Sequence, residues 1–376
     1  MNSVFDYQTA RPPQPLIGPA LRTYPFASFL HFSDPPRLPS SVLQPFPRWK
    51  AFFRVQRDFS SVGEGAYNRR QFLGAAGAAG AVACLSSISP SLQAARIEKD
   101  SPPLVIDCHA HLYSENESKY PTIADPYRPP TGEGTVAHLR REMAAAGVRF
   151  ATAVQTSTFY RWDNRFIADS AAANRDAFVG VCTLNPNDHQ SPAVLRQYFR
   201  QFNVRGLRSI PAKSGRLDDP GVDGLWATAE ELGIVVNVLV NRDKRRELVT
   251  LAQRHPTLPV VIDHCLNLNA GREQNAILSD MLALARVPNL HAKLSFVSTG
   301  SAEAFPFRDM HASCHAIIKA YGPERCVWGS DFPCKLWCPK ATYEQHLRVF
   351  THELGLATES RRHILGETAR RLYFSN

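Results

Sequence analysis

Residues 104–111 read Leu-Val-Ile-Asp-Cys-His-Ala-His and join a short apolar run to two histidines two positions apart. Successive side chains of a strand point to opposite faces, so His109 and His111 share one face. Two imidazoles that converge in this way suit a divalent metal, whose His ligands lie at about 2.0–2.1 Å. A bare His-x-His pair also occurs in ordinary loops, so its place in the fold decides its meaning.

From residue 104 onward, eight short apolar runs alternate with amphipathic stretches. Val- and Ile-rich runs between helices are typical of parallel strands that are covered on both sides. Eight such units predict a single α/β domain, a (β/α)8 TIM barrel over residues 103–375. An open doubly wound sheet is the alternative, but no Gly-x-Gly-x-x-Gly turn follows any run. The expected strands are 104–109, 150–155, 178–184, 204–210, 234–239, 260–264, 290–296 and 326–330.

Polar residues that end three of these runs are expected to meet at one mouth of the barrel. The first run ends with His109 and His111, the sixth with Asp263 and His264, and Asp331 follows the eighth. Barrel enzymes carry their chemistry at the carboxyl ends of the strands. We therefore predict one shared site, although a lone buried Asp is more often a cap or a salt-bridge partner.

Two cationic residues lie on strand faces that are expected to point inward, Arg208 on the fourth run and Lys293 on the seventh. An inward Arg208 can bind a substrate carboxylate through two parallel hydrogen bonds, or it can contact a neighbouring helix. An inward Lys293 is costly unless it is paired, so it either pairs with an acidic neighbour or contacts substrate. We predict that both residues bind substrate, with these alternatives open.

Several short motifs are spread along the expected barrel. They are Asp-x-His-x-His at 107–111, Trp-Asp-Asn at 162–164, Arg-Gly-Leu-Arg at 205–208, Asp-His at 263–264, Lys-Leu-Ser at 293–295, Gly-Ser-Asp-Phe-Pro at 329–333 and Gly-Glu-Thr-Ala-Arg-Arg-Leu at 366–372. Together they resemble the amidohydrolase superfamily, specifically its amidohydrolase-related (family 2) branch with lactonase-like members. The resemblance covers roughly residues 103–375 and implies a hydrolase of cyclic esters or, less often, a decarboxylase.

The resemblance also implies roles for individual residues. His109, His111 and Asp331 would hold one divalent metal, most simply Zn²⁺, and His264 would be a ligand or a hydrogen-bond partner of the reacting oxygen. Asp331 would also take the proton of the attacking water. Zinc lowers the pKa of its bound water to about 7, and a carboxylate beside that water can serve as general base and then as acid. The developing oxyanion needs a cation or donor, such as the metal, His264 or Arg208.

The fifth run departs from the family pattern. Many metal-dependent members carry His or Glu at its end, whereas Asn237 and Asn241 are the polar residues here. Amides are poor zinc ligands beside imidazole. Some lactonase-like relatives work without metal, so a metal-free mechanism through Asp331 and the histidines stays open.

Three functions follow as alternatives. The first is a metal-dependent hydrolase that opens a lactone or similar ester of a sugar or carboxylic acid with an activated water. The second is a non-oxidative decarboxylase of an aromatic or muconate-type acid, and the third is a non-catalytic barrel that binds a sugar acid.

The partner is a small molecule in each case. Residues 101–376 contribute only +4 to the formal charge of +9, too little for nucleic-acid binding. A homo-oligomer stays an alternative to a monomer.

The first hundred residues are a different kind of sequence. Residues 1–67 are rich in Pro, Ser, Arg and Phe without regular periodicity, which predicts a disordered extension or a stretch upstream of a true start at Val62. Residues 68–95 hold an Arg-Arg pair, Phe-Leu and a Gly/Ala run, the layout of a twin-arginine export signal. The run is about half the ~20 residues of a membrane span, so we expect a periplasmic or otherwise exported protein without one. A lipid anchor at Cys84 is the weaker alternative.

The chain has eight cysteines. An exported protein can form disulfides, and Cys334 and Cys338, which follow the eighth run, are the best candidates for a pair. Cysteines in or beside strands are expected to be buried, inert thiols.

Overall fold

A computed structural model describes residues 103–375. The expected extension over residues 1–67, the export signal over residues 68–95 and the anchor at Cys84 lie outside the described residues, so they stay predictions. Within the described range, no helix is long and apolar enough to cross a membrane.

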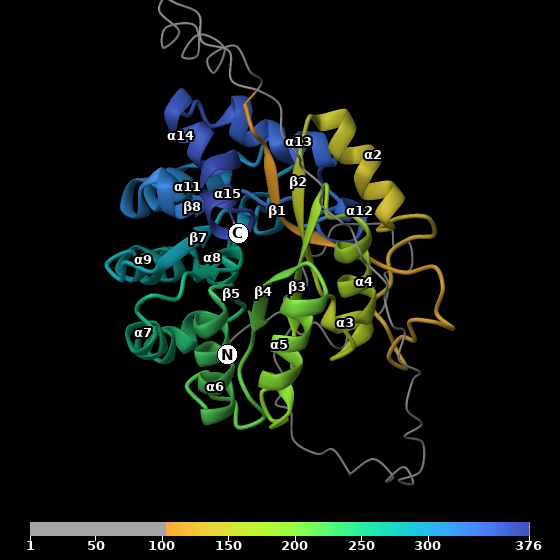
Figure 1. The fold of residues 1–376 in the computed structure, drawn as a ribbon. Coiled ribbons are helices and arrows are strands. Elements are labelled where there is room, and N and C mark those ends of the chain that lie inside the picture. The colour runs from red at the N-terminus through yellow and green to blue at the C-terminus, as the bar shows by residue number, and fades with distance from the viewer. Residues whose placement is uncertain (1–102, 376) are drawn as a thin grey trace, which may run out of the picture. The chain divides into compact units, whose positions relative to one another are not determined.

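In the described residues, eight parallel strands follow one another in sequence order around a barrel (Figure 1). Each strand pairs with the next, from β1 and β2 through to β7 and β8. This order confirms the predicted (β/α)8 barrel and excludes a doubly wound sheet, whose strand order reverses at a central switch point. The strands are β1 (Ile106–His111), β2 (Phe150–Val154), β3 (Phe178–Thr183), β4 (Val204–Ser209), β5 (Val235–Val238), β6 (Val260–Ile262), β7 (Leu290–Lys293) and β8 (Cys326–Val327).

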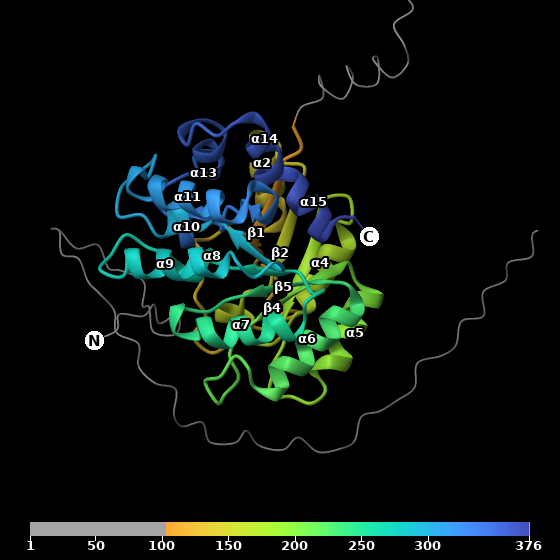
Figure 2. The same ribbon diagram turned by 90° about the vertical axis from the view of Figure 1, so that its left-hand side faces the viewer.

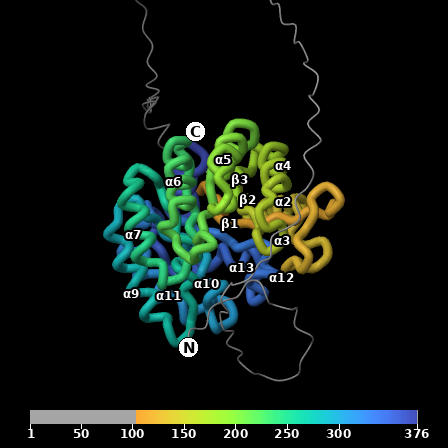
Figure 3. Tube along the Cα trace, turned by 90° about the horizontal axis from the view of Figure 1, so that it is seen from below, coloured from red at the N-terminus to blue at the C-terminus, as the bar shows by residue number. Residues whose placement is uncertain are grey.

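Helices connect the strands and cover the outside of the barrel (Figure 2). Seen from below, they surround β1, β2 and β3 (Figure 3). The longer ones are α2 (Val136–Ala146), α4 (Arg165–Ala173), α5 (Ser191–Gln201), α6 (Pro220–Leu232), α7 (Arg245–Arg254), α9 (Gln274–Leu284) and α11 (Arg308–Tyr321). The shorter ones are α3 (Ser157–Tyr160), α8 (His264–Asn267), α10 (Phe296–Thr299), α12 (Cys334–Trp337), α13 (Tyr343–Arg348), α14 (Thr358–Arg362) and α15 (Thr368–Tyr373). Gly147 and Gly233 end α2 and α6 in the left-handed conformation, as the sequence predicts.

Three strands stop two or more residues earlier than the sequence predicts, and one of them is β8, which ends at Val327 rather than at Ser330. β6 ends at Ile262 rather than at His264, and β7 ends at Lys293 rather than at Phe296. Beyond these points the chain leaves the sheet and turns across the mouth of the barrel, so side chains that were expected on strands lie on the connections that begin there. The apolar runs are longer than the strands because these connections are buried too.

The apolar core has two layers. The outer layer lies between the sheet and the helices, and the inner layer fills the barrel. Helix α15 contributes Ala369 and Tyr373 to the inner layer, so the C-terminal segment helps to fill the barrel from within. The inner layer is Ile106, Cys108, Val154, Val179, Val181, Val235, Val261, Val327, Ala369 and Tyr373.

The barrel closes between β1 and the segment that follows β8. The backbone N–H of Cys108 donates to the carbonyl of Trp328 at 3.0 Å, and the N–H of Asp331 donates to the carbonyl of His109 at 2.8 Å. A Cβ atom on Gly329 would lie 2.7 Å from the Cβ of His109, so this close approach requires glycine. The first and last strands therefore meet directly at the histidine pair.

Asp107 reinforces this closure. Its fully buried carboxylate accepts hydrogen bonds from the backbone N–H groups of His109 and Ser330, at 3.0 and 2.8 Å. The hydroxyls of Ser330 and Tyr343 also donate to it, at 2.5 and 3.0 Å. One carboxylate thus ties β1 to the segment after β8 and to α13.

We expect Asp107→Ala to lower the free energy of unfolding by about 3 kcal/mol or more, because it leaves four buried donors without their acceptor. Urea denaturation measures the loss. Asp176→Ala is the matched control, because Asp176 is 63% exposed beside Arg140 and its loss should leave stability nearly unchanged. Equal losses in the two variants would contradict the role assigned to Asp107.

Candidate functional site

A bulge in β1 aims both histidines into the mouth of the barrel. The pairing of β1 with β2 shifts register between Asp107 and Ala110. Cys108 packs in the inner core layer and Ala110 in the outer one, while both histidines contact residues at the mouth. Bulges often re-aim side chains beside active sites.

His109, His111 and Asp331 form a cluster of possible metal ligands. The Nε2 atoms of the two histidines lie 3.2 Å apart, and Asp331 Oδ1 lies 3.5 Å from Nε2 of His109 and 3.6 Å from Nε2 of His111. These three distances leave a point about 2.0 Å from every donor atom, which matches the Zn–N and Zn–O bond lengths of about 2.0–2.2 Å. Two imidazoles and one carboxylate therefore fit a single small divalent ion with further positions open. All three residues are buried.

The orientation of His111 suits a ligand. Its Nδ1 lies 2.9 Å from the carbonyl oxygen of Val154, and because a carbonyl can only accept, Nδ1 carries the proton and donates it. The Nε2 atom that faces Asp331 is then unprotonated. Burial is the main reason that the pKa of His111 is lowered to about 3, and the charge of Arg208 is the next largest. The ring is therefore neutral at physiological pH.

His264 lies at the start of an unusual turn after β6. Residues 264–267 all have positive φ, between 49° and 61°, and Leu268 N–H donates to the carbonyl of His264 at 3.1 Å. This is one turn of left-handed helix, which costs about 1–2 kcal/mol for each residue that is not glycine. His264 Nδ1 lies 2.8 Å from Ser295 Oγ, and its ring centre lies 4.7 Å from that of His109. Strain held at this place is typical of a functional site.

Asp331 is also held in a left-handed conformation, with φ of 56°. Burial raises the pKa of its carboxyl group to about 7. His346 supports the preceding residue: its Nδ1 donates to the carbonyl of Ser330 at 2.7 Å, and the hydroxyl of Ser298 lies 2.7 Å from its Nε2. The backbone that precedes Asp331 is thereby fixed.

The structure pairs Lys293 with an acidic neighbour, one of the two alternatives that the sequence left open. Lys293 is fully buried, and its Nζ lies 2.7 Å from Asp263 Oδ1. Arg208 Nε lies 3.5 Å from Asp263 Oδ2, and the Arg208 side chain is 8% exposed. Asp263 thus compensates two buried cations beside the histidines. Contact of Lys293 or Arg208 with substrate stays a prediction.

The two asparagines at the fifth strand already have hydrogen-bond partners. Asn237 Oδ1 accepts from Lys293 Nζ at 2.8 Å and from the hydroxyl of Tyr373 at 2.7 Å. Asn241 Oδ1 accepts from the side-chain amide of Asn267 at 2.7 Å. The two lone pairs of Asn237 Oδ1 are both used in this way, whereas Asn241 Oδ1 accepts one hydrogen bond.

Sequence reasoning missed the role of Asp263 as the shared counter-ion and the position of Trp337. The Trp337 ring centre lies 5.4 Å from that of His111, and its indole N–H donates to the hydroxyl of Tyr113 at 3.2 Å. Trp337 ends α12, six residues after Asp331 in the connection that follows β8, and this nearness in sequence is the signal that could have identified it. It forms an aromatic wall beside the ligand cluster.

The candidate cysteine pair does not form a disulfide: Cys334 and Cys338 are both free, buried thiols. Cys334 begins α12 and Cys338 caps its end. The Cys338 thiol donates to the carbonyl of Ser330 at 3.7 Å. It therefore supports the Asp331 segment through a weak hydrogen bond rather than through a covalent link.

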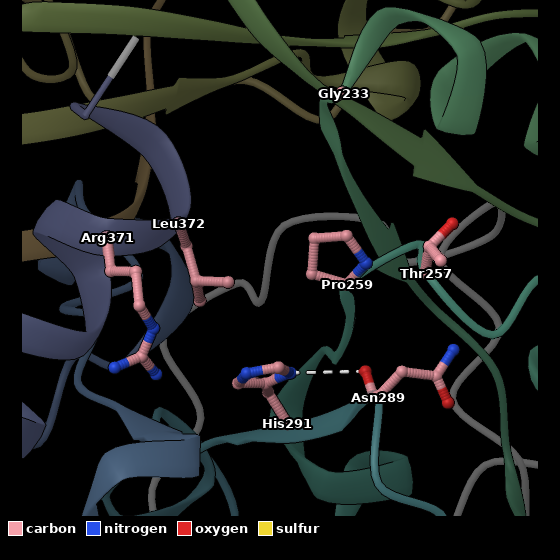
Figure 4. A pocket seen from close by; sticks show the side chains of 7 residues that line it. All are labelled: Gly233, Thr257, Pro259, Asn289, His291, Arg371 and Leu372. Atoms are coloured by element: carbon pink, nitrogen blue, oxygen red, sulfur yellow. Dashed lines mark hydrogen bonds between the residues drawn. The ribbon is translucent and has the colours of Figure 1, made fainter.

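A cleft of about 330 Å³ lies at the opposite end of the strands from this site (Figure 4). Gly233, Pro259 and Asn289 line it and lie just before β5, β6 and β7. The Nδ1 atom of His291 lies 3.2 Å from the carbonyl oxygen of Asn289. Chemistry in this fold belongs to the other end, so this cleft is separate from the candidate site.

Comparisons with known proteins show the family and the fold of this chain. The family described as Amidohydrolase matches residues 106–374. L-fucono-1,5-lactonase of Burkholderia ambifaria is 28% identical over 244 residues, 61% of this chain and 80% of that protein. A solved amidohydrolase of Burkholderia multivorans with bound zinc has a TM-score of 0.59 at 23% identity, covering 72% of this chain and 99% of its own. A probable 2-pyrone-4,6-dicarboxylic acid hydrolase of Acinetobacter baumannii with bound citric acid has a TM-score of 0.58 at 20% identity, covering 72% and 98%. The last two likenesses show the fold.

We expect the support given by His346 to fail in acid. Burial lowers its pKa to about 4, so below the ordinary value of 6.5 the unfolded chain binds a proton that the folded chain does not. Stability is then complete above pH 6.5 and falls by up to about 3 kcal/mol as the pH drops to 4. Urea denaturation across this range measures the slope. His346→Gln should remove this share of the slope, and an unchanged slope in that variant would contradict the assignment.

Proposed function

This chain belongs to the amidohydrolase family, and from that premise we propose that it is a metal-dependent hydrolase that opens a lactone or a similar ester of a sugar or carboxylic acid. The observation that carries the proposal is the buried cluster of His109, His111 and Asp331, whose ligand atoms lie within 4.8 Å of one another. The lactonase relative supports a cyclic ester as the substrate.

His109, His111 and Asp331 would hold the ion. A divalent ion such as Zn²⁺ supplies Lewis acidity, which lowers the pKa of water and polarises a carbonyl group. Asp331 is the base that accepts a proton from the attacking water and returns it to the leaving alkoxide. Burial raises its pKa to about 7 in the ion-free protein, and a bound cation would lower that pKa because positive charge favours the carboxylate.

Arg208 is the candidate for binding the negative charge of the substrate. After burial, its charge is the largest influence on the pKa values of His111, His264 and Asp331, so the guanidinium group lies close to all three. Its Nε faces Asp263, which orients the group. His264, anchored beside Ser295, is placed to donate to the reacting oxygen.

A panel of sugar and dicarboxylic lactones tests the reaction class. We expect release of one proton for each ester opened, without CO₂, and we expect Asp331→Asn to lower kcat by about 10²–10⁴. A pH-indicator assay and a CO₂ electrode separate the two products. CO₂ evolution from aromatic or muconate-type acids would favour the decarboxylase alternative instead.

The same variant separates an enzyme from a binding protein. A barrel that only binds a sugar acid would show no turnover in its natural form, and its affinity would survive Asp331→Asn. Thermal unfolding of the variant confirms that it is folded.

We expect Arg208→Met to raise KM for lactones that carry a free carboxylate by about 10–100-fold, because a charge-assisted hydrogen bond contributes about 1.5–3 kcal/mol. Uncharged lactones of similar size should be affected much less. Steady-state kinetics on both substrate classes measure the difference. An equal loss for both classes, seen in kcat alone, would instead assign Arg208 to the oxyanion.

A further inference from the structure

The ammonium group of Lys293 lies among three acceptors. Its Nζ is 2.7 Å from Asp263 Oδ1, 2.8 Å from Asn237 Oδ1 and 3.1 Å from Nδ1 of His109. An ammonium has three N–H donors and no acceptor, so it donates to Asn237 Oδ1 and to Nδ1 of His109, while its contact with Asp263 Oδ1 is an ion pair without hydrogen-bond geometry. Nδ1 of His109 must therefore supply a lone pair to the ammonium.

This polarity determines which nitrogen of His109 carries the ring proton. A neutral imidazole has one donor and one acceptor nitrogen. Since Nδ1 accepts from Lys293, the proton is on Nε2, 3.2 Å from the unprotonated Nε2 of His111. The hydrogen bonds then run in one direction, from Lys293 through His109 and His111 to the carbonyl of Val154.

Metal binding needs the opposite tautomer. The Nε2 atom of His109 faces the ligand cluster, and a ligating histidine almost always donates its other ring N–H to a carboxylate or carbonyl. The nearest carboxylate oxygen to Nδ1, Asp263 Oδ1, is 3.8 Å away, and it is bound to the lysine instead. The acceptor that would support ligation is thus present but is ion-paired with Lys293.

We propose that Lys293 is a positioning residue that holds His109 with its proton on Nε2 and thereby weakens metal binding at the cluster. The proposal rests on the metal-dependent function proposed above. To bind an ion at Nε2, the ring proton must move to Nδ1 and the ammonium must withdraw from it. The site therefore exchanges its ion more readily than the same three ligands would with Asp263 as the direct partner of His109.

Lys293→Met tests the proposal because methionine has a similar length but no donor. Asp263 can then accept from Nδ1 of His109, while Arg208 still compensates its charge. We expect Zn²⁺ to bind at least about tenfold more tightly, the usual scale for gaining or losing such a partner. Competition of the metal-free protein with a chromophoric zinc chelator measures the affinity without any substrate.

Two matched variants separate positioning from general loosening. Tyr373→Phe removes the other donor to Asn237 but leaves Lys293 on His109, so its zinc affinity should match the natural protein. Asp263→Asn added to Lys293→Met should abolish the gain, because an amide is a weaker acceptor than a carboxylate. The ring ¹⁵N shifts of His109 should report Nε2–H in the natural protein and Nδ1–H in zinc-loaded Lys293→Met.

If Lys293→Met fails to fold, Lys293→Ala leaves a cavity that an added alkylammonium can fill. Zinc should bind this variant tightly, and n-propylammonium should weaken that binding again. Unchanged or weaker zinc binding in a folded lysine variant would overturn the proposal alone. If neither the natural protein nor any variant binds zinc, both this proposal and the metal-dependent function fail.

Discussion

The contact between the first strand and the segment after the last one is the interaction on which the site depends. Asp107 and Ser330 are 223 residues apart in sequence, yet their hydrogen bonds bring the histidine pair and Asp331 to one place. The backbone bond from Asp331 to His109 acts over the same gap. The same contacts therefore close the barrel and bring the ligand cluster together. We expect a variant that loses this closure to lose the cluster as well. The glycine at position 329 allows the approach, and Asp107 holds it.

Burial controls the protonation of the histidines and of Asp331 at the mouth of the barrel. It keeps the imidazoles of His111 and His264 neutral and raises the pKa of the Asp331 carboxyl group to about 7. The buried cations beside them, Lys293 and Arg208, are tolerated because Asp263 compensates both. A buried ion pair is weak evidence for stability, since desolvation offsets much of its attraction. The proposed orientation of His109 by Lys293 accounts for this buried ion pair better than a contribution to stability does.

The barrel and the three-part cluster could be predicted from sequence because each depends on a regular pattern. Apolar runs mark the strands, and the polar residues that end them must share one mouth. The partners of the inward side chains could not be predicted, because strand alternation indicates which face Lys293 lies on but not which groups it contacts. The left-handed turn at His264 was equally out of reach, since no glycine marks it. Whether Cys334 and Cys338 pair could not be predicted either, because spacing says nothing of thiol direction.

The fifth strand shows how a departure from the family pattern is accommodated. In place of a metal ligand it presents Asn237, whose oxygen joins Lys293 at the mouth to Tyr373 of the C-terminal helix. The helix that packs into the barrel interior is thus connected by three hydrogen bonds to His109. Because Asn237 is neutral, the charge of Asp263 is left to balance the lysine and the arginine. A His or Glu at this position would compete for the same space and the same proton. The fifth strand thus carries a hydrogen-bond acceptor for the buried lysine at the position where a metal ligand is missing.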